Sequence, residues 1–201
     1  MIKTVILDLG NVIIPVDFRR CHAALAGVCS VPAEQIPKRI SSTGLVQRFE
    51  TGQVSPQDFV REVSTILGMD VNYAQFWDIW SSIFAPEPLL PDRMLEGLRR
   101  ERRLLLLSNT NAIHFEMIQE RYALLRHFHS YVLSYKVGAL KPSPRIYEAA
   151  IARAGCLAEE CFFADDNLPF VEAALRHGID AVQFHSRAQL ERDLESRGIA
   201  W

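Results

Sequence analysis

The stretch Thr4-Val5-Ile6-Leu7-Asp8-Leu9-Gly10-Asn11-Val12 decides the fold. It is a short apolar run that ends in a carboxylate and leads into a turn containing glycine. In open α/β sheets, ligands bind beyond the carboxyl ends of the strands, so a strand that ends at Asp8 presents a reactive group. Gly10, two residues further on, has no side chain at a place where a second carboxylate would serve proton transfer.

The rest of the chain from about residue 98 alternates apolar runs with helical patterns. The runs that predict further strands lie at 104–107, 131–133, 161–164 and 181–184. The helical patterns between them lie at 112–126, 144–154 and 170–176. Strands alternating with helices at this spacing predict an α/β fold, a Rossmann-like open parallel sheet with helices on both faces.

Residues 17–87 differ, because they carry helical patterns and no convincing strand signal. One such pattern runs over 56–67, with Ser55 as its N-cap. Prolines then mark the return to the alternating region. We therefore expect a small helical cap domain, 17–87, inserted after the first strand of a core domain formed by 1–16 and 88–201.

Composition narrows the possible partners. The 201 residues are 49% hydrophobic and 23% charged, with a formal net charge of −2, which excludes the basic surface expected for nucleic-acid binding. No apolar stretch approaches the roughly 20 residues of a bilayer span, so we expect no membrane partner and a cytoplasmic location. The four cysteines lack metal-binding spacing and read as reduced thiols. The oligomeric state stays open.

Four polar clusters follow predicted strands: Asp8, Ser108-Asn109, Lys141 within Gly138-Ala139-Leu140-Lys141-Pro142, and Asp165-Asp166. Because the carboxyl ends of parallel strands meet at one sheet edge, these clusters are expected to share one site. A carboxylate nucleophile, a lysine, a hydroxyl and further acids suit phosphoryl transfer through an acyl phosphate. Asp8 and Asp165 supply the hard oxygen ligands that Mg²⁺ prefers.

The same clusters resemble the four motifs of the haloacid-dehalogenase-like hydrolase superfamily, in the same order. More narrowly, Asp-Leu-Gly-Asn-Val and Ser-Asn-Thr-Asn resemble the bacterial sugar-phosphate phosphatases of the α-D-glucose-1-phosphate phosphatase type. The segment Phe49-Glu50-Thr51-Gly52-Gln53-Val54-Ser55 resembles part of that family's helical cap, so the resemblance covers essentially the whole chain.

The resemblance implies a role for each cluster. Asp8 would be the nucleophile and a Mg²⁺ ligand, with the Gly10 carbonyl and Asp165 as further ligands. Ser108 and the N–H of Asn109 would bind the phosphate. The remaining catalytic roles would fall to Lys141, which orients Asp8 and offsets the phosphate charge, and to Asp166, which supports the metal or the lysine.

Two positions depart from the family pattern. Most phosphatases of the superfamily carry Asp at the position of Gly10, as general acid and base. General acid–base catalysis contributes about a hundred- to ten-thousandfold, so we expect a good leaving group, or a proton transfer by a substrate hydroxyl, a water or a cap residue. Phe170 stands where the family often has Asn.

The cap turn at Thr51-Gly52 is expected, by the same resemblance, to reach over the catalytic edge. Arg48 and Glu50 would then select the substrate, and a closed cap would exclude water. For His114, near the presumed site, we expect a structural role.

Three functions are compatible with these residues. The first is a Mg²⁺-dependent phosphatase that hydrolyses a small phosphorylated metabolite through an aspartyl-phosphate. Among such metabolites, we expect a sugar phosphate. The second is a haloacid dehalogenase, in which Asp8 attacks carbon; that branch of the superfamily also lacks the second Asp and needs no metal. The third is a non-catalytic module that binds a phosphometabolite.

Overall fold

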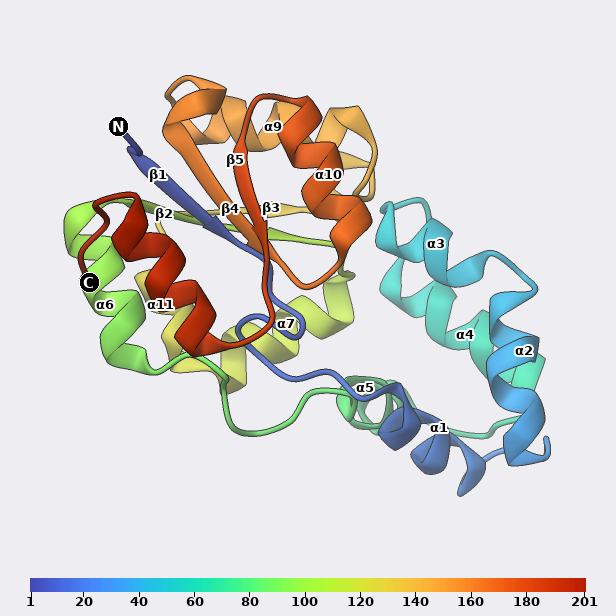
Figure 1. Ribbon diagram of the computed structural model, residues 1–201. Coiled ribbons are helices and arrows are strands. Elements are labelled where there is room, and N and C mark those ends of the chain that lie inside the picture. The colour runs from blue at the N-terminus through green and yellow to red at the C-terminus, as the bar shows by residue number, and fades with distance from the viewer.

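A five-stranded parallel sheet forms the centre of the molecule. The computed structural model describes residues 1–201, and its strands lie in the order β3-β2-β1-β4-β5 (Figure 1). Their bounds are β1 Thr4–Leu7, β2 Arg103–Ser108, β3 Ser130–Leu133, β4 Cys161–Asp165 and β5 Asp180–Gln183. The predicted fold class is confirmed, because each strand follows the previous one through helices and all pairs are parallel.

Helices cover both faces of this sheet (Figure 1). Ile6 of β1 belongs to the apolar core formed with α9 and α10, whereas its neighbours Val5 and Leu7 belong to the core formed with α6, α7 and α11. This alternation is the period-two pattern of a strand that is buried on both sides. The bounds of these helices are α6 Asp92–Glu101, α7 Ala112–Arg121, α9 Pro144–Ala154, α10 Leu168–Arg176 and α11 Arg187–Ser196.

Five further helices form a second group, beyond the carboxyl ends of the strands (Figure 1). They are α1 Phe18–Ala26, α2 Ile36–Ser41, α3 Leu45–Glu50, α4 Pro56–Leu67 and α5 Tyr73–Ser81. Aromatic side chains pack between them: the rings of Phe49 and Phe59 stack with centroids 4.0 Å apart, and Trp80 meets Phe59 at 5.0 Å. We call these helices the cap, and its boundaries at 17 and 87 stay a prediction.

The two segments that connect the cap to the core run side by side. Asp17 N donates to Ile83 O at 2.8 Å, and Ala85 N donates to Pro15 O at 3.0 Å. Between these two bonds, Val16 and Phe84 form an isolated antiparallel bridge. The chain therefore enters and leaves the cap at one place.

One predicted helix is shorter in the structure. The stretch expected over 112–126 divides into α7 and the short 3-10 helix η2, Ala123–His127, because the backbone of Tyr122 is extended and its hydroxyl donates to Ala85 O at 2.6 Å. The smaller elements are α8 Ser134–Val137, η1 Ala33–Gln35 and η3 Ala158–Glu160.

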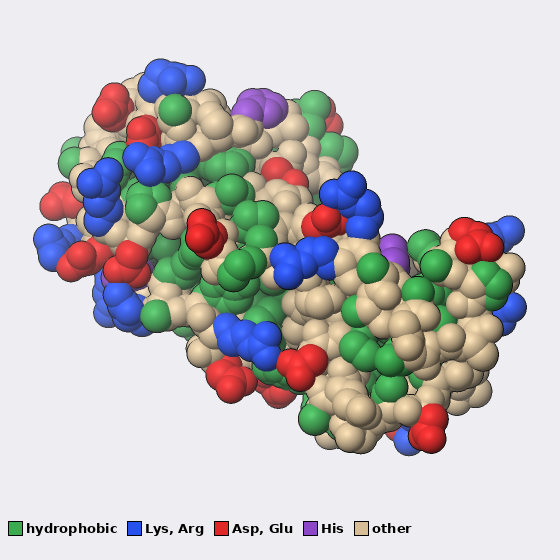
Figure 2. Space-filling view, turned by 90° about the horizontal axis from the view of Figure 1, so that it is seen from below, with side chains coloured by type: hydrophobic (Ala, Val, Ile, Leu, Met, Phe, Trp, Pro, Cys, Tyr) green, Lys and Arg blue, Asp and Glu red, His purple; other side chains and the backbone are tan.

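On the face shown in Figure 2, basic and acidic side chains are interspersed over both lobes. No large patch of one charge sign is visible on this face. No helix combines the length and the apolar character that crossing a membrane would require.

Candidate active site

A cavity of about 360 Å³ lies at the carboxyl ends of β1, β2 and β4. Core residues on its wall include Asp8, Ser108, Lys141 and Asp166, which come from all four predicted clusters. The cap closes the other side with Phe18 and Glu50, among others. The structure thus brings together side chains that are more than a hundred residues apart in the sequence.

Lys141 is the centre of this site. Its Nζ donates to Asp8 Oδ1 at 2.7 Å, to Asp165 Oδ2 at 2.5 Å and to the Leu107 carbonyl at 3.2 Å. The rings of Phe163 and Phe170 lie 5.6 and 5.2 Å from the same nitrogen. Phe170, the position that departs from the family pattern, therefore gives the ammonium an aromatic face.

Burial and charge act in opposite directions on these groups. Burial lowers the pKa of Lys141, but the carboxylates of Asp8 and Asp165 outweigh it, so the pKa is raised and the ammonium stays charged. Burial raises the pKa of Asp8 to about 7, while the charge of Lys141 opposes that rise. A buried carboxylate that lacked this cation would be more costly still.

Asn109 holds the loop that carries Lys141. Its Oδ1 accepts from Lys141 N at 2.7 Å, and its Nδ2 donates to Lys141 O at 3.1 Å. The amide side chain is therefore committed to positioning the lysine, and only the main chain of Asn109 is left for the predicted phosphate contact. The Ser108 hydroxyl, which donates to Asn109 O at 3.4 Å, also lies on the cavity wall.

Three carboxylates form a set of oxygen ligands beside Lys141. One oxygen each of Asp8, Asp165 and Asp166 lies within 4.8 Å of the other two. Asp165 is fully buried, and Asn167 N donates to its Oδ1 at 2.8 Å, which fixes the carboxylate. Clustered carboxylates at one cavity are the hard-oxygen donors that Mg²⁺ takes, so the residues present fit this metal. Gly10 lies on the same wall.

Asn11 is a site residue for which the sequence pattern predicts no role. Its φ of 56° places it in the left-handed region, which Asn tolerates better than most residues. Its Oδ1 accepts from Val16 N at 3.0 Å and its Nδ2 donates to Asp166 Oδ2 at 3.1 Å. Asn11 thus ties the turn after Asp8 to Asp166, and an Asn beside Gly in a turn is a sequence signal that could have identified it.

The two residues predicted to select the substrate lie in different places. Glu50, at the end of α3, lies on the wall of the catalytic cavity. Arg48 is exposed and forms an ion pair with Glu62 of α4, its NH1 3.9 Å from Oε2, and it does not line that cavity. The geometry therefore supports a substrate contact for Glu50 and offers none for Arg48.

The turn after Glu50 rests on the core. Gly52 has a φ of +72°, and a Cβ built on it would lie 2.2 Å from the Tyr135 carbonyl oxygen. Only glycine permits both this backbone conformation and this close approach. The cap turn thus contacts the core directly at α8, and its reach over the catalytic edge stays a prediction.

His114 has a structural environment. It is buried, with Nε2 3.0 Å from the Trp80 carbonyl and Nδ1 3.0 Å from Asn111 Nδ2, and its ring stacks on Trp80. Nε2 carries the proton in this arrangement, because Nδ1 faces an amide donor. Burial lowers the pKa of His114 to about 4. The residue joins core helix α7 to cap helix α5.

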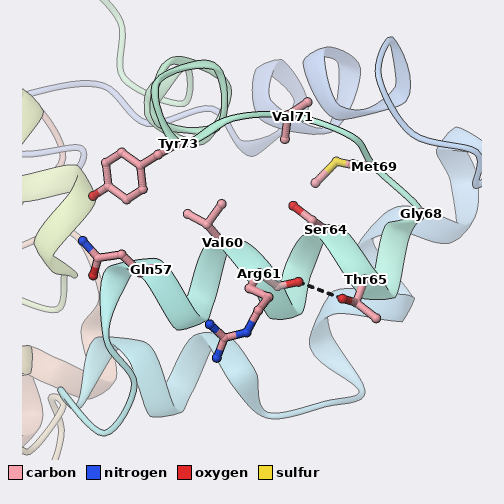
Figure 3. Close-up of a pocket in the computed structure, with 9 residues that line it drawn as sticks. All are labelled: Gln57, Val60, Arg61, Ser64, Thr65, Gly68, Met69, Val71 and Tyr73. Atoms are coloured by element: carbon pink, nitrogen blue, oxygen red, sulfur yellow. Dashed lines mark hydrogen bonds between the residues drawn. The ribbon is translucent and has the colours of Figure 1, made fainter.

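Two other hollows lie in the cap. One, of about 240 Å³, has mostly apolar walls and shares Phe18, Glu50, Ile83 and His114 with the catalytic cavity. The other is an open groove between α4 and the segment up to Tyr73 (Figure 3). Figure 3 shows Val60 and Ser64 of α4 pointing toward Met69 and Val71, and none of the four catalytic clusters contributes to the groove. The groove is therefore no candidate for the catalytic site.

A parallel α/β sheet with a lysine-bound aspartate at a strand end places a buried carboxylate where open sheets of this class bind their ligands. The chain belongs to the haloacid dehalogenase-like hydrolase family, whose model matches residues 2–178. This finding confirms the superfamily that the four motifs predicted. The narrower likeness to the α-D-glucose-1-phosphate phosphatase type stays a prediction.

Relatives of this chain include a phosphatase. The D-ribitol-5-phosphate phosphatase of Bacteroides thetaiotaomicron is 26% identical over 200 residues, which cover 96% of this chain and 97% of the relative. A haloacid-dehalogenase-family enzyme of the same organism, crystallised with magnesium and inorganic phosphate, is 27% identical with a TM-score of 0.84, covering 93% of this chain and 96% of that chain. The chain is thus a hydrolase of the haloacid dehalogenase-like family, and its relatives include a phosphatase and an enzyme crystallised with magnesium and phosphate.

A more distant likeness concerns the fold alone. The L-2-haloacid dehalogenase of Xanthobacter autotrophicus is 18% identical with a TM-score of 0.63, covering all of this chain and 85% of that chain. It shares the architecture of core and cap.

Proposed function

We propose that this enzyme hydrolyses a small phosphorylated metabolite, a sugar or polyol phosphate, through an aspartyl-phosphate at Asp8. The observation that carries the proposal is the buried ammonium of Lys141, bonded to Asp8 and Asp165 inside a cluster of three carboxylates. Such a cluster is costly to bury and suits the transfer of an anionic group. The name of the D-ribitol-5-phosphate phosphatase supports the substrate class.

Asp8, Lys141 and Ser108 have different roles in the proposed reaction. An oxygen of Asp8 attacks the phosphorus, the bond from phosphorus to the leaving oxygen breaks, and an acyl phosphate forms. Lys141 holds Asp8 in place and offsets the charge of the phosphoryl oxygens, while the Ser108 hydroxyl donates to one of them. Water then attacks the phosphorus and releases inorganic phosphate from Asp8.

Asp8, the Gly10 carbonyl and Asp165 would hold Mg²⁺, with Asp166 close by. When bound, the ion supplies positive charge against the repulsion between Asp8 and the phosphate. Glu50 and Phe18 on the cap side of the cavity would contact the part of the substrate that carries no phosphate. Arg48 is left out of this proposed contact because it faces Glu62.

Phosphate release from a panel of sugar and polyol phosphates, with Mg²⁺ and after chelation, tests this function. We expect release to require Mg²⁺ and to fall by about a thousandfold or more in Asp8→Asn, because the nucleophile is lost. Asp70→Asn, an exposed cap residue, is the control and should behave as the wild type. Acid-quench trapping of phosphate on the wild-type protein should detect the acyl phosphate.

Other outcomes would overturn the proposal. Undiminished turnover by Asp8→Asn would rule out an aspartyl-phosphate intermediate. Halide release from 2-haloacids without Mg²⁺ would replace it with attack on carbon. Tight binding of sugar phosphates with no product across the panel would establish a binding module.

A further inference from the structure

The catalytic cavity has a carboxyl group on its cap side that the proposed mechanism does not use. The core offers no general acid at Gly10, which has no side chain. Asp8 is engaged with Lys141, and Asp166 accepts from Asn11. Both ring nitrogens of His114 are already bonded. Among the side chains that line this cavity and exchange protons, Glu50 is left.

Glu50 is free to meet a ligand. Its carboxyl group takes part in no hydrogen bond and no ion pair within the protein, although the residue is partly buried. It also lines the apolar cavity of about 240 Å³, so it stands between the phosphate end of the site and a space inside the cap. A carboxyl group that lines two cavities and has no partner in the protein is available to bond a substrate oxygen.

We propose that Glu50 is the general acid and base of this enzyme, supplied by the cap in place of the carboxylate that Gly10 lacks. The proposal rests on the proposed phosphatase function and deepens it. In this proposal the leaving group of the substrate lies at the junction of the two cavities. There the oxygen of the leaving group meets the Glu50 carboxyl group. The substrates that need this residue are esters of alcohols, whose alkoxides are poor leaving groups.

With this assignment, Glu50 gives one proton in the first step of the reaction and takes one back in the second. When Asp8 attacks and the bond from phosphorus to the leaving oxygen breaks, neutral Glu50 gives its proton to that oxygen and an alcohol leaves. Ionised Glu50 then takes a proton from water as the water oxygen attacks the phosphorus of the acyl phosphate. The bond from phosphorus to Asp8 breaks, inorganic phosphate leaves, and Asp8 and Glu50 return to their starting states.

The surroundings of Glu50 suit this task. Burial raises the pKa of Glu50 to about 7, close to the value at which one group both gives and takes a proton near neutrality. The charged or titratable groups that share its two cavities are Asp8, Lys141, Asp166, Cys21, His22 and His114. The helices packed against α3 are α2, α4 and α8, and none of their charged residues forms an ion pair with Glu50. These residues are Lys38, Arg39, Asp58, Arg61, Glu62 and Lys136.

The main chain fixes the position of Glu50. It is the last residue of α3, and Gly52, two residues later, lies against the Tyr135 carbonyl of the core. The cap turn therefore sets the distance from Glu50 to the catalytic edge whenever the cap rests on α8. Positioning through a rigid contact is what acid catalysis requires, since the acid must reach the leaving oxygen.

A series of phosphate monoesters with graded leaving groups tests this role. kcat/KM is measured for wild type and Glu50→Gln on alkyl phosphates, on phenyl phosphate and on 4-nitrophenyl phosphate. We expect Glu50→Gln to lose about a hundredfold or more on alkyl phosphates and little on 4-nitrophenyl phosphate, whose leaving group needs no proton. The ratio of the wild-type kcat/KM to that of Glu50→Gln on alkyl phosphates should fall as the pH rises through about 7, because ionised Glu50 has no proton to give and the titration of Asp8 is common to both proteins.

The controls separate the possible results. Glu62→Gln, a cap residue outside both cavities, should match the wild type on every ester, and unfolding curves should show that Glu50→Gln folds. An equal loss on all esters would overturn the acid role and leave the phosphatase function intact. A wild type without Asp8-dependent turnover of any ester would overturn both proposals.

Discussion

Gly10 could carry a side chain. Its backbone lies outside the left-handed region, and a Cβ built on it would lie 3.2 Å from Cγ2 of Val16, a methyl group that can move by a few tenths of an ångström. Neither conformation nor space therefore demands glycine here. The position is open to a carboxylate close to Asp8.

This opening allows a rescue experiment at the level of one residue. In a Glu50→Gln background, Gly10→Asp should recover at least about tenfold of the lost turnover of alkyl phosphates, because it returns an acid to the cavity. Gly10→Asn fills the same volume without an acidic proton and should recover nothing. Equal recovery by Asn and Asp, measured as kcat/KM, would contradict the proton-transfer account.

At this scale the sequence predicts residue types better than contacts. The four motifs named Asp8, Lys141 and Asp165, which meet in the structure. The double hydrogen bond of Asn109 to the main chain of Lys141 was not predicted, because it depends on how two distant loops lie against each other. The same limit explains Arg48, whose direction depends on the packing of α3 on α4.

Among the elements, α3 and its two flanking glycines decide how the cap meets the core. Gly44 precedes the helix with a φ of +65° and has open space around its Cβ position, whereas Gly52 follows it and faces the Tyr135 carbonyl. Gly44 and Gly52 share the left-handed backbone conformation, but only Gly52 has a neighbouring residue at its Cβ position. They form a matched pair for substitution.

Gly44→Ala and Gly52→Ala should both lower the free energy of unfolding by about 1 kcal/mol through left-handed strain. Gly52→Ala should lower it further and reduce kcat/KM, because the new methyl group pushes the turn away from Tyr135. Urea unfolding and steady-state kinetics measure both effects. Equal kcat/KM in the two variants would show that the contact at Gly52 does not position the site.

The elements themselves were largely predictable. Regular patterns with clear caps, such as 56–67 after Ser55 and 144–154 with proline at its start, match α4 and α9 to the residue. The expected helix over 112–126 ends early because Tyr122 reaches across to the linker at Ala85. Such a break depends on a tertiary contact, which no local pattern contains.

Across the whole molecule, His114 links stability to pH. The unfolded chain takes up a proton on this histidine below about pH 6.5, whereas the folded protein resists it until about pH 4. The unfolded state therefore binds more protons in this window, so stability is full above pH 6.5 and declines as the pH falls. The decline should reach about 3 kcal/mol at most, by linkage.

Unfolding by urea at a series of pH values between 4 and 7.5 measures this slope. His114→Gln keeps a donor toward the Trp80 carbonyl but cannot take up a proton, so its stability should depend less on pH in that window. A slope equal to that of the wild type would show that other groups cause the pH dependence.

The side-by-side linkers at Val16 and Phe84 make the cap a unit that can be considered for replacement by another helical domain. Both ends of the insertion meet at one antiparallel bridge, so the main chain of β1 and Asp8 is compatible with another helical module whose ends meet at the same spacing. A chimaera of this core with a foreign cap would keep the nucleophile and inherit a new leaving-group partner. Under the Glu50 proposal, it would also inherit or lose its acid.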